Sequence, residues 1–285
     1  MHSVNWLIVI ASDEGKVKMK LEYRDILDCL KRHPSSCVAL KPTSLISYKL
    51  IKDIADEVQD AKYPAVDFSR LVLSEKMERV TLPLTELAIA AAQIGARLLI
   101  DAEQSELQPA VDLMALYLMQ KVNKNRSIVY NTYQLYLQDS GLRALAHQKW
   151  LHENGANFAA KFVRGAYLSH EFSRQKSSHP NYRLCASKAL TDQNYNENAL
   201  MFCGGQDPII FATHNAGSVK MIGSSIIRHR RQNLHEFAYL MGFRHRISEV
   251  LSGFKTLEYV PYGPTDVKIP YLLRRLEENA DIMSK

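Results

Sequence analysis

Short apolar runs rich in β-branched and aromatic residues alternate with longer segments of helical period along nearly the whole chain. Such alternation is typical of strands that are each followed by a helix. The short runs predict eight strands, at residues 6–11, 37–41, 97–101, 127–131, 158–163, 209–213, 235–240 and 257–260. The periodic segments predict helices that include residues 85–93, 108–122, 141–153, 186–201 and 270–279.

This order of elements predicts an α/β fold built on one parallel sheet. Eight successive strand and helix units are typical of a closed (βα)8 TIM-like barrel. No linker divides the chain, so we expect residues 1–285 to form a single domain. The segment 53–77 is longer than one connection needs, and the Tyr63-Pro64 step predicts two helices with a break between them.

Composition and charge narrow the class of protein. With 46% hydrophobic and 23% charged residues, the 285-residue chain has the balance of a globular protein and not of a disordered one. A net charge of +6, spread along the chain, is only weak evidence for an anionic ligand. Cys29, Cys37, Cys185 and Cys203 stand singly, without the C-x-x-C spacing of zinc or redox sites, and we expect reduced thiols.

Several common motifs are missing from the sequence. Neither G-x-G-x-x-G nor G-x-x-x-x-G-K-[ST] occurs, which disfavours a Rossmann fold and a P-loop. There is no H-E-x-x-H to predict a metal site and no G-x-S-x-G to predict a serine hydrolase. The apolar run at residues 6–11 is too short to cross a membrane, and no Arg-rich and Ser-rich leader precedes it.

Polar side chains gather where the predicted strands end. In a parallel barrel the carboxyl ends of the strands meet at one mouth, where ligands bind. Each residue taken singly is typical of a cap or a loop hydrogen bond, and His214 alone suggests a hydrogen-bonded histidine more than a catalyst. Together they predict a polar site at the mouth. They are Lys41, Asp101, Glu103, Asn131, Gln134, Arg164, Tyr167, Thr213, His214, Asn215 and Tyr259.

Six segments of the chain resemble one enzyme family in their sequence, order and spacing. They are LLIDAEQ (98–104), VYNTYQLYL (129–137), KFVRGAYL (161–168), FATHN (211–215), YVPYG (259–263) and YLLRRLEEN (271–279). The chain resembles eukaryotic proline dehydrogenase, also called proline oxidase, from about residue 39 to residue 279. The resemblance implies a distorted (βα)8 barrel with noncovalent FAD at the carboxyl-terminal mouth.

The same resemblance implies the reaction and its surroundings. Proline dehydrogenases oxidise L-proline to Δ1-pyrroline-5-carboxylate, the first step of proline catabolism, and pass the electrons to a membrane quinone. We therefore expect a mitochondrial location, on the matrix side of the inner membrane with peripheral contact, and no nucleic-acid partner. The basic run around His229 is interpreted as a solvated helix face.

Residues implied for catalysis and proline binding come from four strands and the last helix. Paired arginines in YLLRRLEEN can grip a carboxylate through planar, two-point hydrogen bonding, and a lysine can supplement them. Asp101 could orient Lys41 or an arginine. Tyr259 and Leu240 would cover the proline ring, and Glu103 would play a supporting role. By resemblance the principal residues are Lys41, Asp101, Leu240, Tyr259, Arg274 and Arg275.

Residues implied for FAD binding come mostly from the middle of the chain. Asn131 matches a position beside the isoalloxazine edge, Lys161 one near its reactive face, and Arg164 one near the pyrophosphate. Gly165 and Ala166 would keep the backbone close to the cofactor. The remaining expected contacts are Tyr167, Ser187, Lys188, Thr191, Thr213, His214, Asn215 and Glu278.

Two features depart from the family pattern, and a third bears on which substrate within the family is favoured. The family's N-terminal arm is expected to be short or missing here, and Asp13 and Glu14 match its acidic first-strand end only loosely. Tyr239 stands where relatives commonly carry Gln. Tyr271 stands where Tyr is typical of proline-specific relatives and Ser of hydroxyproline preference. The alternatives are thus a hydroxyproline dehydrogenase of the same family and a truncated, inactive barrel with a binding or regulatory role.

Overall fold

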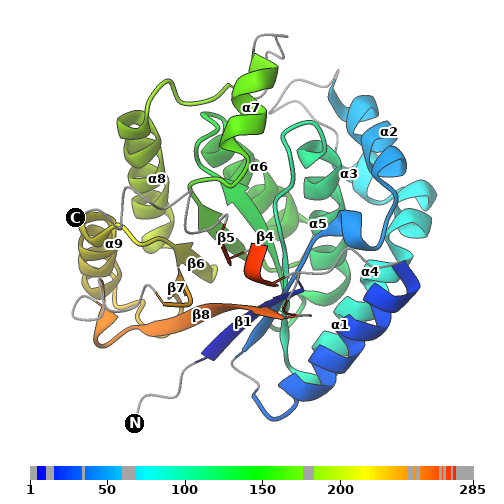
Figure 1. Ribbon diagram of the computed structural model, residues 1–285, viewed down its shortest axis with the longest axis horizontal. Helices are drawn as coiled ribbons and strands as arrows, with labels where there is room; N and C mark the ends of the chain where they lie inside the picture. The colour runs from blue at the N-terminus through cyan, green and yellow to red at the C-terminus, as the bar shows by residue number, and fades with distance from the viewer. Residues whose placement is uncertain are drawn as a thin grey trace.

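The computed structural model describes residues 5–10, 16–33, 36–59, 68–175, 183–242, 247, 251–262, 265, 268–270 and 272–273. The predicted barrel is confirmed: eight parallel strands are hydrogen-bonded in sequence order, and β1 pairs with both β2 and β8 to close the sheet. Helices surround the strands (Figure 1). The strands are β1 Asn5–Ile10, β2 Cys37–Leu40, β3 Arg97–Ile100, β4 Val129–Gln134, β5 Ala160–Val163, β6 Ile209–Ala212, β7 Glu236–Leu240 and β8 Lys255–Tyr262.

All eight predicted strands are confirmed, with ends that differ by up to three residues. The largest difference is in β4, which was predicted to end at Asn131 and continues to Gln134. The helices are α1 Lys16–Leu30, α2 Tyr48–Gln59, α3 Phe68–Val72, α4 Glu75–Ile94, α5 Gln108–Val122, α6 Ser140–Glu153, α7 Leu168–Gln175, α8 Lys188–Cys203 and α9 Ala216–Arg228, with a short 3-10 turn η1 at Pro42–Ser44. None of the helices described above is long and apolar enough to cross a membrane.

Capping residues explain where several helices begin and end. Ser74 begins α4 by accepting a hydrogen bond from Met77 N, and Gly95 ends it in the left-handed conformation, with φ of 71°. The prediction of 108–122 as a helix is confirmed to the residue by α5, which has proline at its second position, where no backbone donor is needed. The Tyr63-Pro64 break lies outside the described residues, between α2 and α3.

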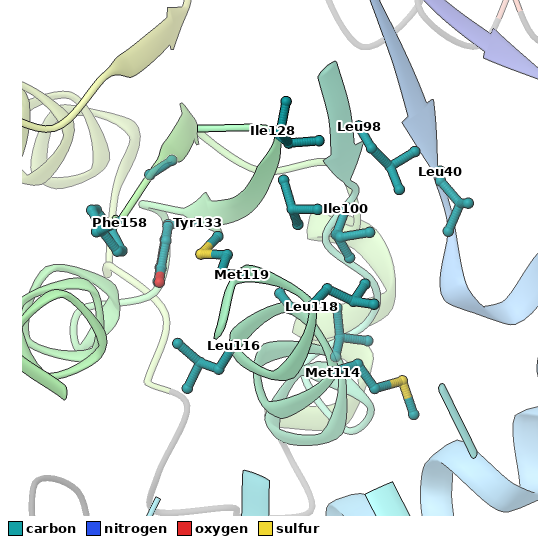
Figure 2. Packing of buried hydrophobic residues seen from close by; sticks show 14 of the residues in the cluster. Leu40, Leu98, Ile100, Met114, Leu116, Leu118, Met119, Ile128, Tyr133 and Phe158 are labelled. Atoms are coloured by element: carbon teal, nitrogen blue, oxygen red, sulfur yellow. The ribbon is translucent and has the colours of Figure 1, made fainter. Parts of the chain in front are cut away.

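Two apolar layers hold the barrel together. Outward-facing strand residues such as Leu40, Leu98 and Ile100 pack against α5 residues such as Met114 and Leu118 (Figure 2). Because α2, α3 and α4 also pack on α5, every residue of α5 from 108 to 119 is buried. The second layer consists of strand residues, with Ala159 directly before β5, and fills the barrel interior: Cys37, Ala39, Leu99, Tyr130, Ala159, Ile210, Ala238 and Leu257.

An ion pair stands in the barrel interior at its amino-terminal end. Arg97, the first residue of β3, donates to Glu236, the first residue of β7, over 2.6 Å, and both side chains are nearly buried. The Arg97 guanidinium also lies over the Tyr130 ring, 5.9 Å from its centroid. This pair is far from the carboxyl ends of the strands, and we assign it a structural role.

Candidate active site at the barrel mouth

Strand alternation decides which of the polar residues face the barrel interior. The interior layer contains residues 37 and 39 of β2, 99 of β3 and 130 of β4, so every second residue continues along the same face. Lys41, Asp101, Thr132 and Lys161 therefore extend this interior face toward the mouth, and the register pairs Thr132 with Lys161. On β2 to β5 the carboxyl-terminal layer of the barrel is therefore polar, whereas the layer below it is apolar.

Asp101 and Lys161 form the centre of this polar layer. Lys161 Nζ donates to Asp101 Oδ1, and the two side chains are only 6% and 11% exposed. The sequence suggested that Asp101 could orient Lys41 or an arginine; among the described residues its ion-pair partner is Lys161 from β5, and an arginine partner stays a prediction. A buried charge is tolerated only when it is paired, so each of the two fixes the other in place.

Lys41 and Glu103 lie beside this pair and are linked by Tyr167. Lys41 Nζ is 5.8 Å from the centroid of the Tyr167 ring, and the Tyr167 hydroxyl is 3.5 Å from Glu103 Oε2. Glu103 Oε1 accepts hydrogen bonds from the backbone N and the hydroxyl of Thr43, at 3.3 and 2.7 Å. Burial raises the pKa of Glu103, against the opposing effects of the Thr43 hydrogen bonds and of Lys41.

Gln134 joins three strand ends and is absent from the contacts predicted by resemblance. Its amide nitrogen donates to the Glu103 carbonyl at 2.9 Å, and its amide oxygen accepts from Ala166 N at 3.0 Å. Thr132, one alternation earlier, is also absent from those predicted contacts, and its buried hydroxyl has no hydrogen-bond partner among the described residues. The sequence already placed Gln134 among the polar residues at the mouth. Alternation from Tyr130 along β4 would also have identified Thr132, had the strand's true end been known.

Arg164 is the centre of a second cluster, after β5 and β6. It donates to Asp192 at 2.5 Å, to Thr213 at 2.7 Å and to Ser218 at 2.9 Å. Its guanidinium lies over the Tyr195 ring, 4.4 Å from the centroid. Burial raises the pKa of Asp192, but hydrogen bonds and charge from Lys188 and Arg164 outweigh it and lower this pKa below its ordinary value.

This second cluster brings together the amino-terminal ends of two helices. Asp192 lies in the second turn of α8 and Ser218 in the first turn of α9, and Arg164 reaches both. Ser187 caps α8 by accepting from Leu190 N, and Asn215 caps α9 by accepting from Ser218 N. Two helix amino termini beside a guanidinium and a lysine make a region suited to anionic groups.

Other predicted contacts also line the mouth. His214 Nε2 accepts a hydrogen bond from Leu240 N at 2.8 Å, which places any proton of a neutral ring on Nδ1. Leu240 pairs in register with Tyr259, whose ring packs on the apolar interior layer. Thr191 donates to the Ser187 carbonyl within the first turn of α8.

The structure places the Asn131 side chain away from the expected position and gives a structural reason for glycine at Gly165, whose expected cofactor contact stays a prediction. Asn131 is fully buried and donates to Asp112 of α5 at 2.8 Å, so its side chain lies in the helix layer and not at the mouth. Gly165 has φ of 147°, and a Cβ there would stand 1.4 Å from the Tyr136 ring. Glycine is thus required by Tyr136 and by its own backbone conformation, without any cofactor. Tyr239 likewise packs in the helix layer.

The predicted carboxylate clamp lies outside the described residues. This applies to Arg274, Arg275, Glu278 and Tyr271, and also to Asp13 and Glu14 near the start of the chain. Residues 268–270 and 272–273 are helical, as the sequence predicted for the start of that segment. The roles of the arginine pair and of Glu278 therefore stay predictions.

Comparisons with known proteins identify the family. A family model described as "Proline dehydrogenase" matches residues 7–285. The chain is 34% identical over 247 residues to the carbapenem antibiotics biosynthesis protein CarD of Pectobacterium carotovorum subsp. carotovorum, and 31% identical over 229 residues to mitochondrial proline dehydrogenase 1 of Homo sapiens. These matches cover 85% and 73% of this chain but 62% and 36% of the relatives, so the chain spans only part of their length.

A solved structure of similar fold supports the architecture. Proline utilization A from Bdellovibrio bacteriovorus, inactivated by N-propargylglycine, superposes with a TM-score of 0.80. The match covers 97% of this chain and 30% of that one, at 20% sequence identity. At this identity the likeness establishes the barrel fold alone.

Proposed function

The chain belongs to the proline dehydrogenase family, and on that premise we propose that it oxidises L-proline to Δ1-pyrroline-5-carboxylate with FAD as cofactor. The observation that carries the proposal is the family match over residues 7–285 together with a polar barrel mouth centred on Asp101 and Lys161. A barrel fold alone would not suffice, because it supports many chemistries.

The described residues fit a flavin dinucleotide in two respects. The Thr132 hydroxyl is buried next to Lys161 and has no partner in the part of the chain that the structure describes, so a polar ring edge of the cofactor would satisfy it. Arg164 directs three of its five N–H groups to described residues, and the ends of α8 and α9 converge on it, which suits the pyrophosphate. Lys188 and Ser187 at the start of α8 would complete the phosphate and ribose contacts, with Thr191, Thr213, His214 and Asn215 on the adenosine side.

The residues of the chain would perform distinct tasks in this reaction. Lys41, with Arg274 and Arg275, would bind the proline carboxylate, and Leu240 and Tyr259 would cover its ring, which excludes water. FAD, when bound, supplies the acceptor for a hydride equivalent from proline C5. The Lys161 ammonium, held by Asp101, would supply a fixed positive charge that favours the reduced cofactor. The substrate amine must be neutral, and its proton can leave to solvent.

The electron acceptor and the location follow from the same premise. A membrane quinone would receive the electrons, with peripheral contact at the matrix side of the mitochondrial inner membrane. The word "mitochondrial" in the name of the human relative supports this location. Reduction of a soluble quinone analogue by proline and the purified chain tests the acceptor.

An anaerobic titration of the purified flavoprotein with L-proline tests the proposal. We expect the oxidised flavin spectrum to bleach, with D-proline as the control that leaves it oxidised. Faster bleaching by hydroxyproline would reassign the chain to the related hydroxyproline reaction. A folded, flavin-loaded chain that neither compound bleaches would favour an inactive binding protein.

A further inference from the structure

A buried ion pair outside the mouth is connected to it by hydrogen bonds. Arg143 of α6 and Asp112 of α5 are 1% and 0% exposed and lie 2.5 Å apart, in the layer between the strands and the helices. Neither residue carries a task in the proposed reaction. Buried ion pairs can often be replaced by apolar residues without loss of stability, so stability alone gives little reason for this pair.

Asp112 connects to Glu103 through one side-chain amide. Gln108 donates to Asp112 Oδ1 at 2.8 Å, and its amide oxygen accepts from the Glu103 backbone N at 3.0 Å. Gln108 itself is 1% exposed. The orientation of this amide, and thus of the Glu103 backbone, follows from the ionised oxygen of Asp112, which accepts only the NH₂ end of Gln108.

Arg143 connects to the same residue from the opposite side. Its second terminal nitrogen donates to Ser140 Oγ at 2.9 Å, and Ser140 Oγ donates to the Gln134 carbonyl at 2.6 Å. Gln134 in turn binds the Glu103 carbonyl and the Ala166 N–H. The bonds close a ring of six residues: Glu103, Gln108, Asp112, Arg143, Ser140 and Gln134.

We propose that Asp112 and Arg143 are positioning residues for the active site. Through Gln108 and Gln134 the pair fixes both backbone polar groups of Glu103, and through Gln134 it fixes the backbone of Ala166 beside Arg164 and Tyr167. The loops after β3, β4 and β5 are thereby held in one arrangement at the mouth. The effect on catalysis rests on the proposed function, whereas the effect on the loops does not.

The test removes the charges and keeps the volume. The double variant Asp112→Asn with Arg143→Met leaves an amide oxygen for Gln108 but breaks the links from Arg143 to Ser140 and to Asp139, whose Oδ2 lies 3.2 Å from Arg143 Nε. Its matched control is Glu236→Gln with Arg97→Met, the same chemical change in the ion pair at the opposite end of the barrel. Hydrogen exchange is followed by mass spectrometry on peptides covering residues 101–107 and 164–168, together with flavin content and proline kinetics.

We expect faster exchange at these two segments, with α5 and α6 unchanged and flavin retained. The kcat/KM for proline should fall by about 10-fold to 100-fold, the range for a small misplacement of catalytic groups. The control pair should change neither quantity. Ser140→Ala opens the ring at one point and keeps both charges, although Arg143 loses one acceptor. It should show the same changes in weaker form even if the double variant does not fold.

Specific outcomes would overturn the proposal. Unchanged exchange at both segments in the folded double variant, or in Ser140→Ala if only that variant folds, would show that the pair does not position the loops. Faster exchange throughout the chain, or an equal effect of the control pair, would show a merely structural role. A wild-type flavoprotein that proline does not reduce would refute the proposed function, while the exchange data would still decide the positioning of the loops.

Discussion

The ion pair between Lys161 and Asp101 allows a quantitative prediction, because both charges are almost completely buried. With side chains 6% and 11% exposed, neither charge can recover hydration by a small movement. At contact distances and an effective dielectric constant of about 20, the attraction between the two charges is ~4 kcal/mol. Lys161→Met leaves Asp101 buried without its partner, and removal of one member of a buried pair typically costs about 3 to 5 kcal/mol.

We therefore expect Lys161→Met to lower the free energy of unfolding by roughly 4 kcal/mol, and Asp101→Asn to lower it by a similar amount. The double variant should be more stable than either single variant, because it buries no unpaired charge. Urea denaturation of the four proteins, without flavin and at constant ionic strength, gives the coupling energy by a double-mutant cycle.

Two results would refute this reasoning. A loss below about 1 kcal/mol for Lys161→Met, the range of an exposed ion pair, would mean that the site admits water to both groups. Additive effects of the two substitutions would mean that the residues do not interact, and Asp101 would then need another partner at the mouth.

Four further outcomes are expected. Arg164→Ala should weaken FAD retention more than proline recognition in the remaining holoenzyme, and unchanged flavin occupancy would count against its pyrophosphate role. Arg275→Lys should raise the proline concentration required for half-saturation by about ten-fold to a hundred-fold at constant flavin content, because Lys loses the two-point hydrogen bonding to the carboxylate. Anaerobic titration of the flavin spectrum with proline measures this. Acid denaturation should release yellow flavin, since binding is noncovalent, and flavin retained on the chain would contradict this. Burial lowers the pKa of His147 and of His235 from 6.5 to about 4, so the unfolded chain binds protons at a higher pH than the folded chain does. The free energy of unfolding should therefore fall by roughly 3 kcal/mol per histidine as the pH falls from about 6.5 to 4. Tyr133→Phe, which removes the hydroxyl bonded to His147, is the variant for comparison.

The order of elements and the location of the site could be read from the sequence. Each strand is a short apolar run bounded by polar residues, and each helix shows its own period, so local pattern suffices for eight strands and a parallel barrel. Lys41, Asp101 and Arg164 were placed at strand ends for the same reason, whereas Lys161 was named only through the family resemblance. Their presence together at the mouth follows from barrel topology.

The partners of these residues were decided only by the tertiary structure. In a parallel barrel both faces of each strand are buried, so apolar residues occupy both faces and the sequence does not show which alternate set points inward. The orientation of β4 in the folded barrel directs Asn131 toward Asp112 in the helix layer and Thr132 toward the barrel interior. Asp101 and Lys161, 60 positions apart in the chain, meet because the shared register of β3, β4 and β5 brings their strand ends to one level, and no local pattern records that register.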